Sequence, residues 1–225
     1  MKNIPTIPHE KKTEAPTNAK ILYWMPTDTP YGNFSLTRLK ISHQIDYVNL
    51  QIQKAFQKYD LIQSHVTAQS PFNIEYEITN EIIIHMIKKI ADELTSIIHC
   101  LYLYEQKRDY PQSLSIDCIG KLINKIDQSV DFFKKHIDIL DSINNLCNAH
   151  KHSLVNSNQS HIGRDEPCVF AFYMPHNQSS SDTEFMVMRI SELIDRFDKF
   201  YQDCDSWLCD FSKRHLPRNS AKIGK

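Results

Sequence analysis

The fold of this chain is decided by residues 81–104, which read EIIIHMIKKIADELTSIIHCLYLY. Apolar residues recur here at intervals of three or four positions, at Ile83, Ile87, Ile90, Leu94, Ile97, Leu101 and Tyr104. This spacing places them on one face of an α-helix. We expect a long helix that begins with Asn80 as its N-cap and runs to about Gln106. The sequence Arg108-Asp109-Tyr110-Pro111 then ends it.

Segments on both sides of this helix repeat the helical periodicity, and a polar stretch from Ser64 to Asn73 separates the first two of them as a loop. We expect the other helices at about 35–62, 115–124 and 127–154, followed by a last helix capped by Ser191 and ended by Pro217. The apolar side of the last helix carries Leu193, Ile194, Phe197, Phe200, Tyr201, Cys204, Leu208 and Phe211. The chain is therefore expected to be mainly helical.

Two short runs differ from the rest because they are rich in β-branched and aromatic residues. Cys168–Met174 and Thr183–Arg189 flank one polar loop, which is typical of a β-hairpin. The predicted fold is an antiparallel bundle of four to five long helices, with a small β-hairpin at about 168–190 before the last helix. The apolar run Ile21–Met25, stopped by Pro26, is expected to be a strand or a clip that packs onto the helices.

Three regions follow from composition along the chain. Residues 1–20 carry three prolines among polar residues and are expected to be a flexible tail. Residues 21–216 are expected to form a single helical domain, and 217–225 a basic tail.

Overall composition excludes several classes of protein. The 225 residues are 41% hydrophobic and 24% charged, as in an ordinary globular protein. A net charge of −1 excludes a strongly basic nucleic-acid binder, although a local basic patch remains open. Six cysteines without a CxxC pair indicate reduced thiols. No run approaches the ~18 apolar residues that a membrane span needs, so a cytoplasmic protein without membrane contact is expected.

Polar chemistry is concentrated on residues 141–153, which read DSINNLCNAHKHS. At ~100° per residue, Cys147 falls in the middle of the buried stripe, close to Leu140, Ile143 and Leu154. His150 and Lys151 fall at the two borders of that stripe. The remaining polar side chains form one ribbon at i, i+3 and i+4 spacing, where they can touch one another. This polar ribbon consists of Asp141, Asn145, Asn148 and His152.

The run Cys147-Asn148-Ala149-His150-Lys151-His152 resembles the R-x4-6-H signature of HEPN domains (higher eukaryotes and prokaryotes nucleotide-binding). In that family the motif closes a long helix of an α-bundle. Asn148 and His152 match the polar residue and the terminal His, whereas Cys147 stands where the family has Arg. The resemblance covers roughly residues 75–155 and the last helix.

The resemblance implies a bacterial protein that binds or cleaves RNA in a stress or phage-defence role, as toxins of toxin–antitoxin pairs do. It also implies a homodimer in which two motif copies meet, and it leaves room for an operon-encoded protein partner. In metal-independent RNA cleavage His152 would act as general acid or base, with Asn148 beside it and His150 and Lys151 in support. No metal and no cofactor are implied. Lys151 or Arg164 are the candidates to replace the missing Arg charge.

Other interpretations of the same residues stay open. The domain can be a catalytically inactive dimerisation or interaction module that serves as a subunit of a larger complex. The His and Lys residues can simply complement the dipole and bond the free carbonyls at a helix C-terminus. The basic C-terminal tail can contact RNA phosphates or can be merely a solubilising, frayed end; its basic residues are Lys213, Arg214, His215, Arg218, Lys222 and Lys225.

Two rival kinds of site are weaker. A metal site is disfavoured because His150 and His152 are two residues apart, which is the wrong spacing on a helix. His85 and His99 could approach His136 or His150 across a bundle, but the Glu81–His85 pair has no second copy. Nucleophilic Cys–His catalysis needs an exposed thiol, and the position of Cys147 in the stripe predicts an inert, buried one.

Overall fold

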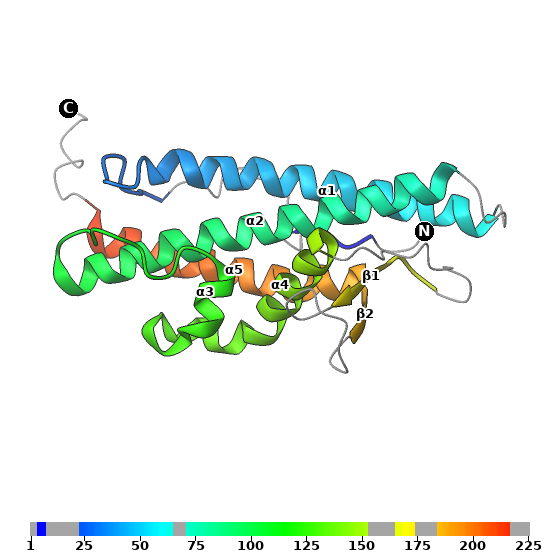
Figure 1. Cartoon of the computed structure of the whole chain (residues 1–225). Coiled ribbons are helices and arrows are strands. Elements are labelled where there is room, and N and C mark those ends of the chain that lie inside the picture. Colours follow the sequence, from blue (N-terminus) through cyan, green and yellow to red (C-terminus); the bar gives the residue numbers. More distant parts are fainter. Residues whose placement is uncertain (1–3, 8–22, 65–70, 153–164, 174–183, 217–225) are drawn as a thin grey trace, which may run out of the picture.

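A computed structural model describes residues 4–7, 23–64, 71–152, 165–173 and 184–216 of the chain. It confirms a mainly helical fold with a small antiparallel hairpin before the last helix (Figure 1). The elements in chain order are α1 (Phe34–Ser64), α2 (Pro71–Lys107), α3 (Ile119–Asn124), the 3-10 helices η2 (Ile126–Gln128) and η3 (Asp131–His136), α4 (Ile137–His152), β1 (Cys168–Tyr173), β2 (Glu184–Arg189) and α5 (Ile190–His215).

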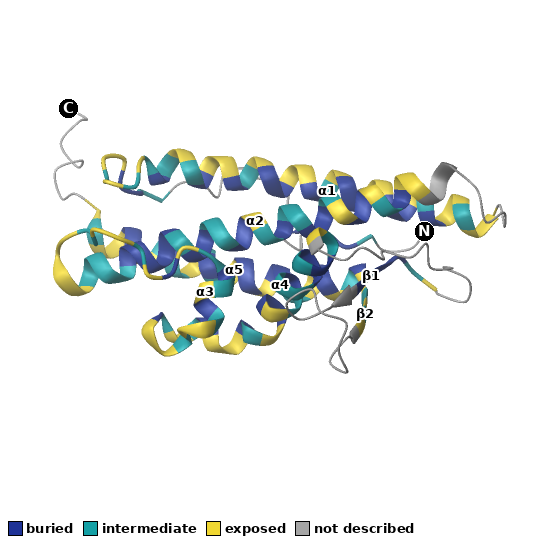
Figure 2. Cartoon of the chain, in the orientation of Figure 1, coloured by how far each residue is buried: buried dark blue, intermediate teal, exposed yellow. Residues whose placement is uncertain are grey.

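Helix α2 is the centre of the structure, as its long apolar stripe predicts. It lies antiparallel beside α1 and also contacts α3, α4 and α5. Figure 2 shows its buried residues along the middle of the molecule. Six of the seven residues of the predicted stripe are buried, and Tyr104 is half-buried at the far end. Burial on several sides explains why this long helix is rich in apolar residues.

The start of α2 differs from the prediction, because the helix begins at Pro71 and Asn80 is not its cap. Proline suits the first turn of a helix, where its missing N–H has no partner to lose. Asn80 is buried inside the helix, and its Nδ2 donates a hydrogen bond to the carbonyl oxygen of Cys168 at 3.3 Å. The Tyr76 hydroxyl lies 3.1 Å from the same oxygen and 3.0 Å from the Cys168 N. These side chains hold the start of β1 against α2, which is a tertiary contact that local sequence does not reveal.

The segment 115–154 also differs, because the two predicted helices are shorter than expected. Two 3-10 helices, η2 and η3, replace the first third of the predicted helix 127–154, and α4 starts at Ile137. Between them the backbone of Ser129 and Val130 is extended. Helix α3 starts only at Ile119, whose N–H donates to Asp92 Oδ1 of α2 at 2.8 Å. A side chain from a distant helix thus satisfies the first turn of α3 and fixes where it begins.

The hairpin and the last helix agree with the prediction except at their junction. Strands β1 and β2 pair in register from Cys168 with Arg189 to Tyr173 with Glu184. Ser191 is not a cap, because α5 already begins at Ile190, whose N–H donates to the Pro167 carbonyl at 2.9 Å. All eight residues of the predicted apolar side of α5 are buried. The helix ends at His215, and Pro217 lies outside the described residues.

Part of the predicted N-terminal tail is packed instead of free. Ile7 is fully buried, and its backbone N–H and C=O both hydrogen bond to the Asn49 side-chain amide of α1. The run that was expected to be a strand or a clip is a clip in its described part, residues 23–25, where Met25 is buried.

Arg38 of α1 links this clip to α5. Its guanidinium is buried and donates hydrogen bonds to the hydroxyls of Tyr23 and Tyr201 and to the Asp205 carboxylate.

None of the described helices combines the length and apolar character required to span a membrane.

Candidate functional site

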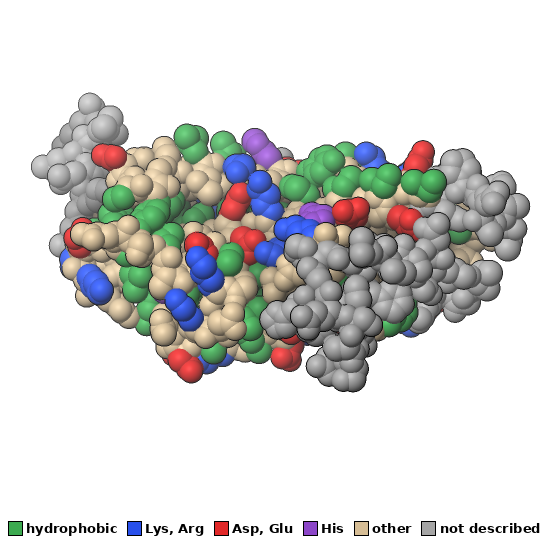
Figure 3. Space-filling model, viewed as in Figure 1, with side chains coloured by type: hydrophobic (Ala, Val, Ile, Leu, Met, Phe, Trp, Pro, Cys, Tyr) green, Lys and Arg blue, Asp and Glu red, His purple; other side chains and the backbone are tan. Residues whose placement is uncertain are grey.

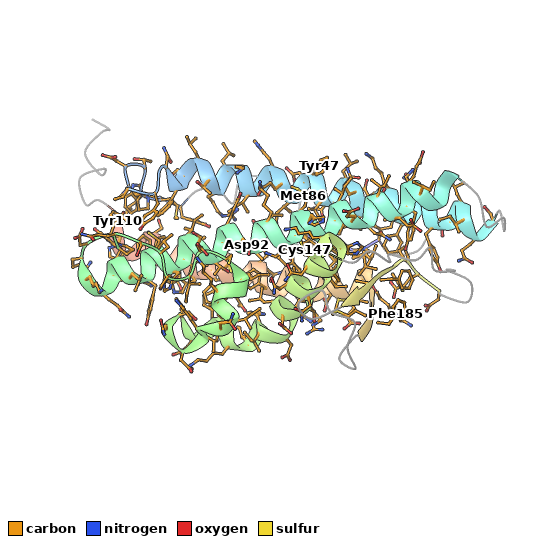
Figure 4. The ribbon with its side chains drawn as sticks, in the orientation of Figure 1. Tyr47, Met86, Asp92, Tyr110, Cys147 and Phe185 are labelled. Atoms are coloured by element: carbon orange, nitrogen blue, oxygen red, sulfur yellow. The ribbon has the colours of Figure 1, made fainter. Side chains whose placement is uncertain are left out.

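The end of α4 packs against the middle of α2, and this junction contains the predicted motif (Figure 4). Leu140, Ile143 and Cys147 are buried, as the helical phase predicts, and only 1% of Cys147 is exposed. The residue in the position of the family's Arg is therefore a core side chain. Burial raises the pKa of its thiol, so Cys147 is protonated near neutral pH.

Of the four members of the polar ribbon, the structure brings Asp141 and Asn145 together. Asn145 Nδ2 donates a hydrogen bond to Asp141 Oδ2 at 3.0 Å, across one turn of helix. Asn148 is half-buried. His152 is the last residue of α4, and its side chain lies outside the described part of the chain, as do Leu154 and Arg164. The predicted contact between Asn148 and His152 therefore stays a prediction.

A histidine from α2 faces the motif from the other side of the junction. His85 Nδ1 lies 3.0 Å from Cys147 Sγ. Its other ring nitrogen, Nε2, lies 3.5 Å from Glu81 Oε1, one helical turn earlier in α2. About a third of the His85 side chain is exposed. We call Glu81, His85, Cys147 and His150 the histidine cluster.

These contacts place the two ring nitrogens of His85 in different surroundings. A buried, protonated thiol can donate its S–H to Nδ1, and Nε2 faces the Glu81 carboxylate. Cys147 was expected to be an inert thiol, and it does belong to the core. In addition, it orients a partly exposed imidazole so that the Nε2 side faces a carboxylate.

His150 contributes a second imidazole, which is half-buried at the border of the α4 stripe as predicted. Burial lowers its pKa, the nearby charge of Glu81 acts in the opposite direction, and His85 lowers it further. Nε2 of His150 is buried and has no hydrogen-bond partner among the described residues. An imidazole nitrogen in this state can accept a proton or a hydrogen bond from a ligand.

Two lysines bring positive charge to the position where the family has Arg. Lys151 of α4 and Lys88 of α2 both lower the pKa of Cys147, whereas Asp92 and Glu81 raise it. Lys151 is exposed, and Lys88 Nζ is held by Asp92 Oδ2 at 2.9 Å. Figure 3 shows histidine, basic and acidic side chains gathered over the middle of α2 on this face. Positive and negative side chains are mixed on this face, which agrees with the net charge of −1 of the whole chain.

The other histidines considered as metal ligands lie elsewhere. His99 Nε2 contacts Ser115 Oγ at 3.0 Å, and His136 Nε2 contacts Asp203 Oδ2 at 2.5 Å. Of the three other histidines considered, His85 is the one whose charge acts on His150. Within the described ranges, no group of three or more His, Cys, Asp or Glu residues is arranged to hold a metal ion.

The basic end of α5 is partly neutralised by the protein itself. Arg214 and His215 both contact Glu105 Oε1 of α2 at 2.9 Å, and Lys213 pairs with Asp210. These residues fasten the end of α5 to the end of α2, so they are less available to RNA phosphates than the sequence suggested.

Sequence reasoning missed the pairing of His85 with Cys147. The available signal was the Glu81–His85 spacing of four, which puts both side chains on one face of α2. Which helix that face meets depends on packing.

No family model matches this chain, and searches of curated proteins and of solved structures found no match either.

Proposed function

We propose that this protein is an HEPN-like RNA-binding protein that cleaves RNA without a metal ion, at the junction of α4 with α2. The observation that carries the proposal is the histidine cluster. The end of α4, which resembles the family motif, faces a second, partly exposed histidine on α2, and positive charge from Lys88 and Lys151 reaches the same position.

The chemistry needs one group that accepts a proton and one that donates a proton. A base removes the proton of the RNA 2′-hydroxyl, and the oxygen attacks the adjacent phosphorus. The bond from phosphorus to the 5′-oxygen breaks, and an acid protonates the departing oxygen, which leaves a 2′,3′-cyclic phosphate. We assign these roles to His152 of the motif and His85 of α2, with Asn148 as a polar contact to the RNA. Lys151, supported by Lys88, stabilises the negative charge that develops on the phosphate.

The test compares RNA integrity with the purified wild-type protein and three single variants. His152→Ala and His85→Gln each remove a proton-transfer group, and we expect each to slow cleavage at least ~100-fold. His215→Gln is the matched control, because it changes a histidine at the far end of α5, and it should cleave like the wild type. A chelator should leave the rate unchanged, and an all-deoxy substrate should stay intact.

Failure of the wild type to cleave any RNA would refute the catalytic proposal, as would wild-type rates in both His152→Ala and His85→Gln.

One observation favours a second candidate function, a non-catalytic interaction module. Cys147 is a buried, neutral thiol in the place of the family's Arg, and such a group stabilises no anion. Binding of RNA without cleavage, or no binding at all, would support that module.

A further inference from the structure

A cleft of about 440 Å³ lies between α5 on one side and η3 with the start of α4 on the other. Its volume falls within the range of roughly 300–1,000 Å³ that is usual for small-molecule sites. None of its lining residues belongs to the histidine cluster. Three titratable or charged side chains line it from each side. They are Lys135, His136 and Asp138 from η3 and α4, and Arg196, Lys199 and Asp203 from α5.

Asp203 is a negative charge that the protein holds in place in this cleft. His136 is 7% exposed and contacts Asp203 Oδ2 through Nε2 at 2.5 Å, and Lys135 Nζ lies 2.7 Å from the same oxygen. Burial raises the pKa of Asp203, but the hydrogen bonds from Lys135 and His136 outweigh it and lower the pKa, so the carboxylate is charged at neutral pH. Its other oxygen, Oδ1, has no hydrogen-bond partner among the described residues. A carboxylate that is already ordered can bind a ligand without a further entropic cost.

Asp138 adds a second negative charge from the first turn of α4. It is exposed, and it forms no ion pair within the part of the chain that the structure describes. The cleft therefore offers carboxylate oxygens that no described side chain occupies.

Arg196 and Lys199 bring positive charge from one side of α5, where they are three residues apart. Arg196 Nη1 lies 3.4 Å from Glu192 Oε1, and the other two guanidinium nitrogens have no partner among the described residues. Lys199 Nζ pairs with Asp195 at 2.6 Å, and both side chains are exposed. Exposed ion pairs contribute little to stability, so a ligand carboxylate can replace them. The planar guanidinium of Arg196 can bind both oxygens of such a carboxylate.

The mixture of charges identifies the class of ligand. A ligand with negative charge alone would also meet the two aspartates, and a ligand with positive charge alone would also meet the arginine and the two lysines. A ligand that carries both charges on neighbouring atoms matches both signs at once. A free amino acid has this property, because its carboxylate and its ammonium group are attached to the same carbon.

We propose that the cleft between η3 and α5 binds a free amino acid. The ligand carboxylate lies on Arg196 and Lys199, and the ligand ammonium group lies on Asp203 and Asp138. The site shares no residue with the proposed RNA-cleavage site, and it does not depend on RNA cleavage.

Thermal denaturation of the full chain with each of the standard L-amino acids in turn, at millimolar concentration, tests the proposal. We expect at least one of them to raise the melting temperature, because a ligand that binds only the folded chain stabilises it. Isothermal titration calorimetry then measures the dissociation constant of that amino acid. Its N-acetyl derivative lacks the positive charge and its carboxamide derivative lacks the negative one, so each should bind at least ~10-fold more weakly.

Two variants test the assignment of the two charges. Arg196→Gln and Asp138→Asn should each weaken binding at least ~10-fold, and Asp138 is chosen because Asp203 also holds η3 to α5. Lys213→Gln is the matched control, because it changes an exposed cation in the last turn of α5, and it should bind like the wild type. The proposal is overturned if none of the amino acids binds, if the N-acetyl derivative binds as tightly as the free amino acid, or if either test variant binds as tightly as Lys213→Gln.

Discussion

His136 is buried and His150 is half-buried, and burial lowers the pKa of both, yet their surroundings differ. His136 Nε2 meets Asp203 Oδ2 at 2.5 Å, and Lys135 Nζ shares that carboxylate oxygen at 2.7 Å. Nε2 of His150 has no described partner. The first histidine fastens η3 to α5, whereas Nε2 of the second forms no hydrogen bond with the part of the chain that the structure describes. The comparison teaches that burial alone does not say whether a histidine has a hydrogen-bond partner, because two imidazoles whose pKa is lowered by burial differ in what Nε2 meets.

The His136–Asp203 contact should give the largest effect on stability. Asp203→Ala removes the acceptor of a buried imidazole N–H and the partner of Lys135, and unpaired buried polar groups are costly. We expect a loss of about 1–3 kcal/mol in the free energy of unfolding, measured by urea denaturation at pH 7.5. Asp141→Ala is the control, because this aspartate is exposed, and it should change stability by less than ~0.5 kcal/mol. Equal effects of the two substitutions would contradict the structural role of the contact.

His150→Leu should have a smaller effect and can even be stabilising. The substitution removes Nε2, a buried nitrogen without a hydrogen-bond partner among the described residues, so the loss of this atom breaks no described hydrogen bond. The free energy of unfolding should change by less than about 1 kcal/mol in the same urea experiment, whereas His136→Leu should lose about 1–3 kcal/mol. If His150→Leu destabilises the protein as much as His136→Leu does, then His150 is a structural residue and the contrast fails.

The smallest expected effect is on how the free energy of unfolding changes with pH in the wild type and in His150→Leu. The pKa values of His99, His136 and His150 are all lowered in the folded protein, with burial as the largest cause. Below the unfolded pKa of about 6.5, the unfolded chain binds protons that the folded chain does not. The free energy of unfolding should therefore fall as the pH is lowered from about 7 toward the folded pKa values.

His150→Leu should make this decline shallower, because one of the three histidines no longer contributes. Urea denaturation of both proteins at several pH values between 5 and 7.5 measures the two slopes. Identical slopes would mean that His150 is as free to take up a proton in the folded state as in the unfolded one.

Helical periodicity was sufficient for the fold class, but it placed several element boundaries wrongly. Asn80 has the chemistry of an N-cap, yet it lies inside α2 because its amide bonds the backbone of Cys168, which is far away in the sequence. The start of α3 depends on Asp92 of another helix. Capping preferences are local, and these boundaries were set by contacts between distant segments.

For the candidate site, the sequence by itself determined the phase of residues 141–153, because 3.6 residues per turn fixes which side chains of a helix share a face. Cys147 is in the core, His150 is at its border and Asp141 bonds Asn145, as that phase requires. Only the tertiary structure decided that His85 meets Cys147. Periodicity gives the direction of a side chain around its own helix, whereas the packing of helices decides what that side chain meets.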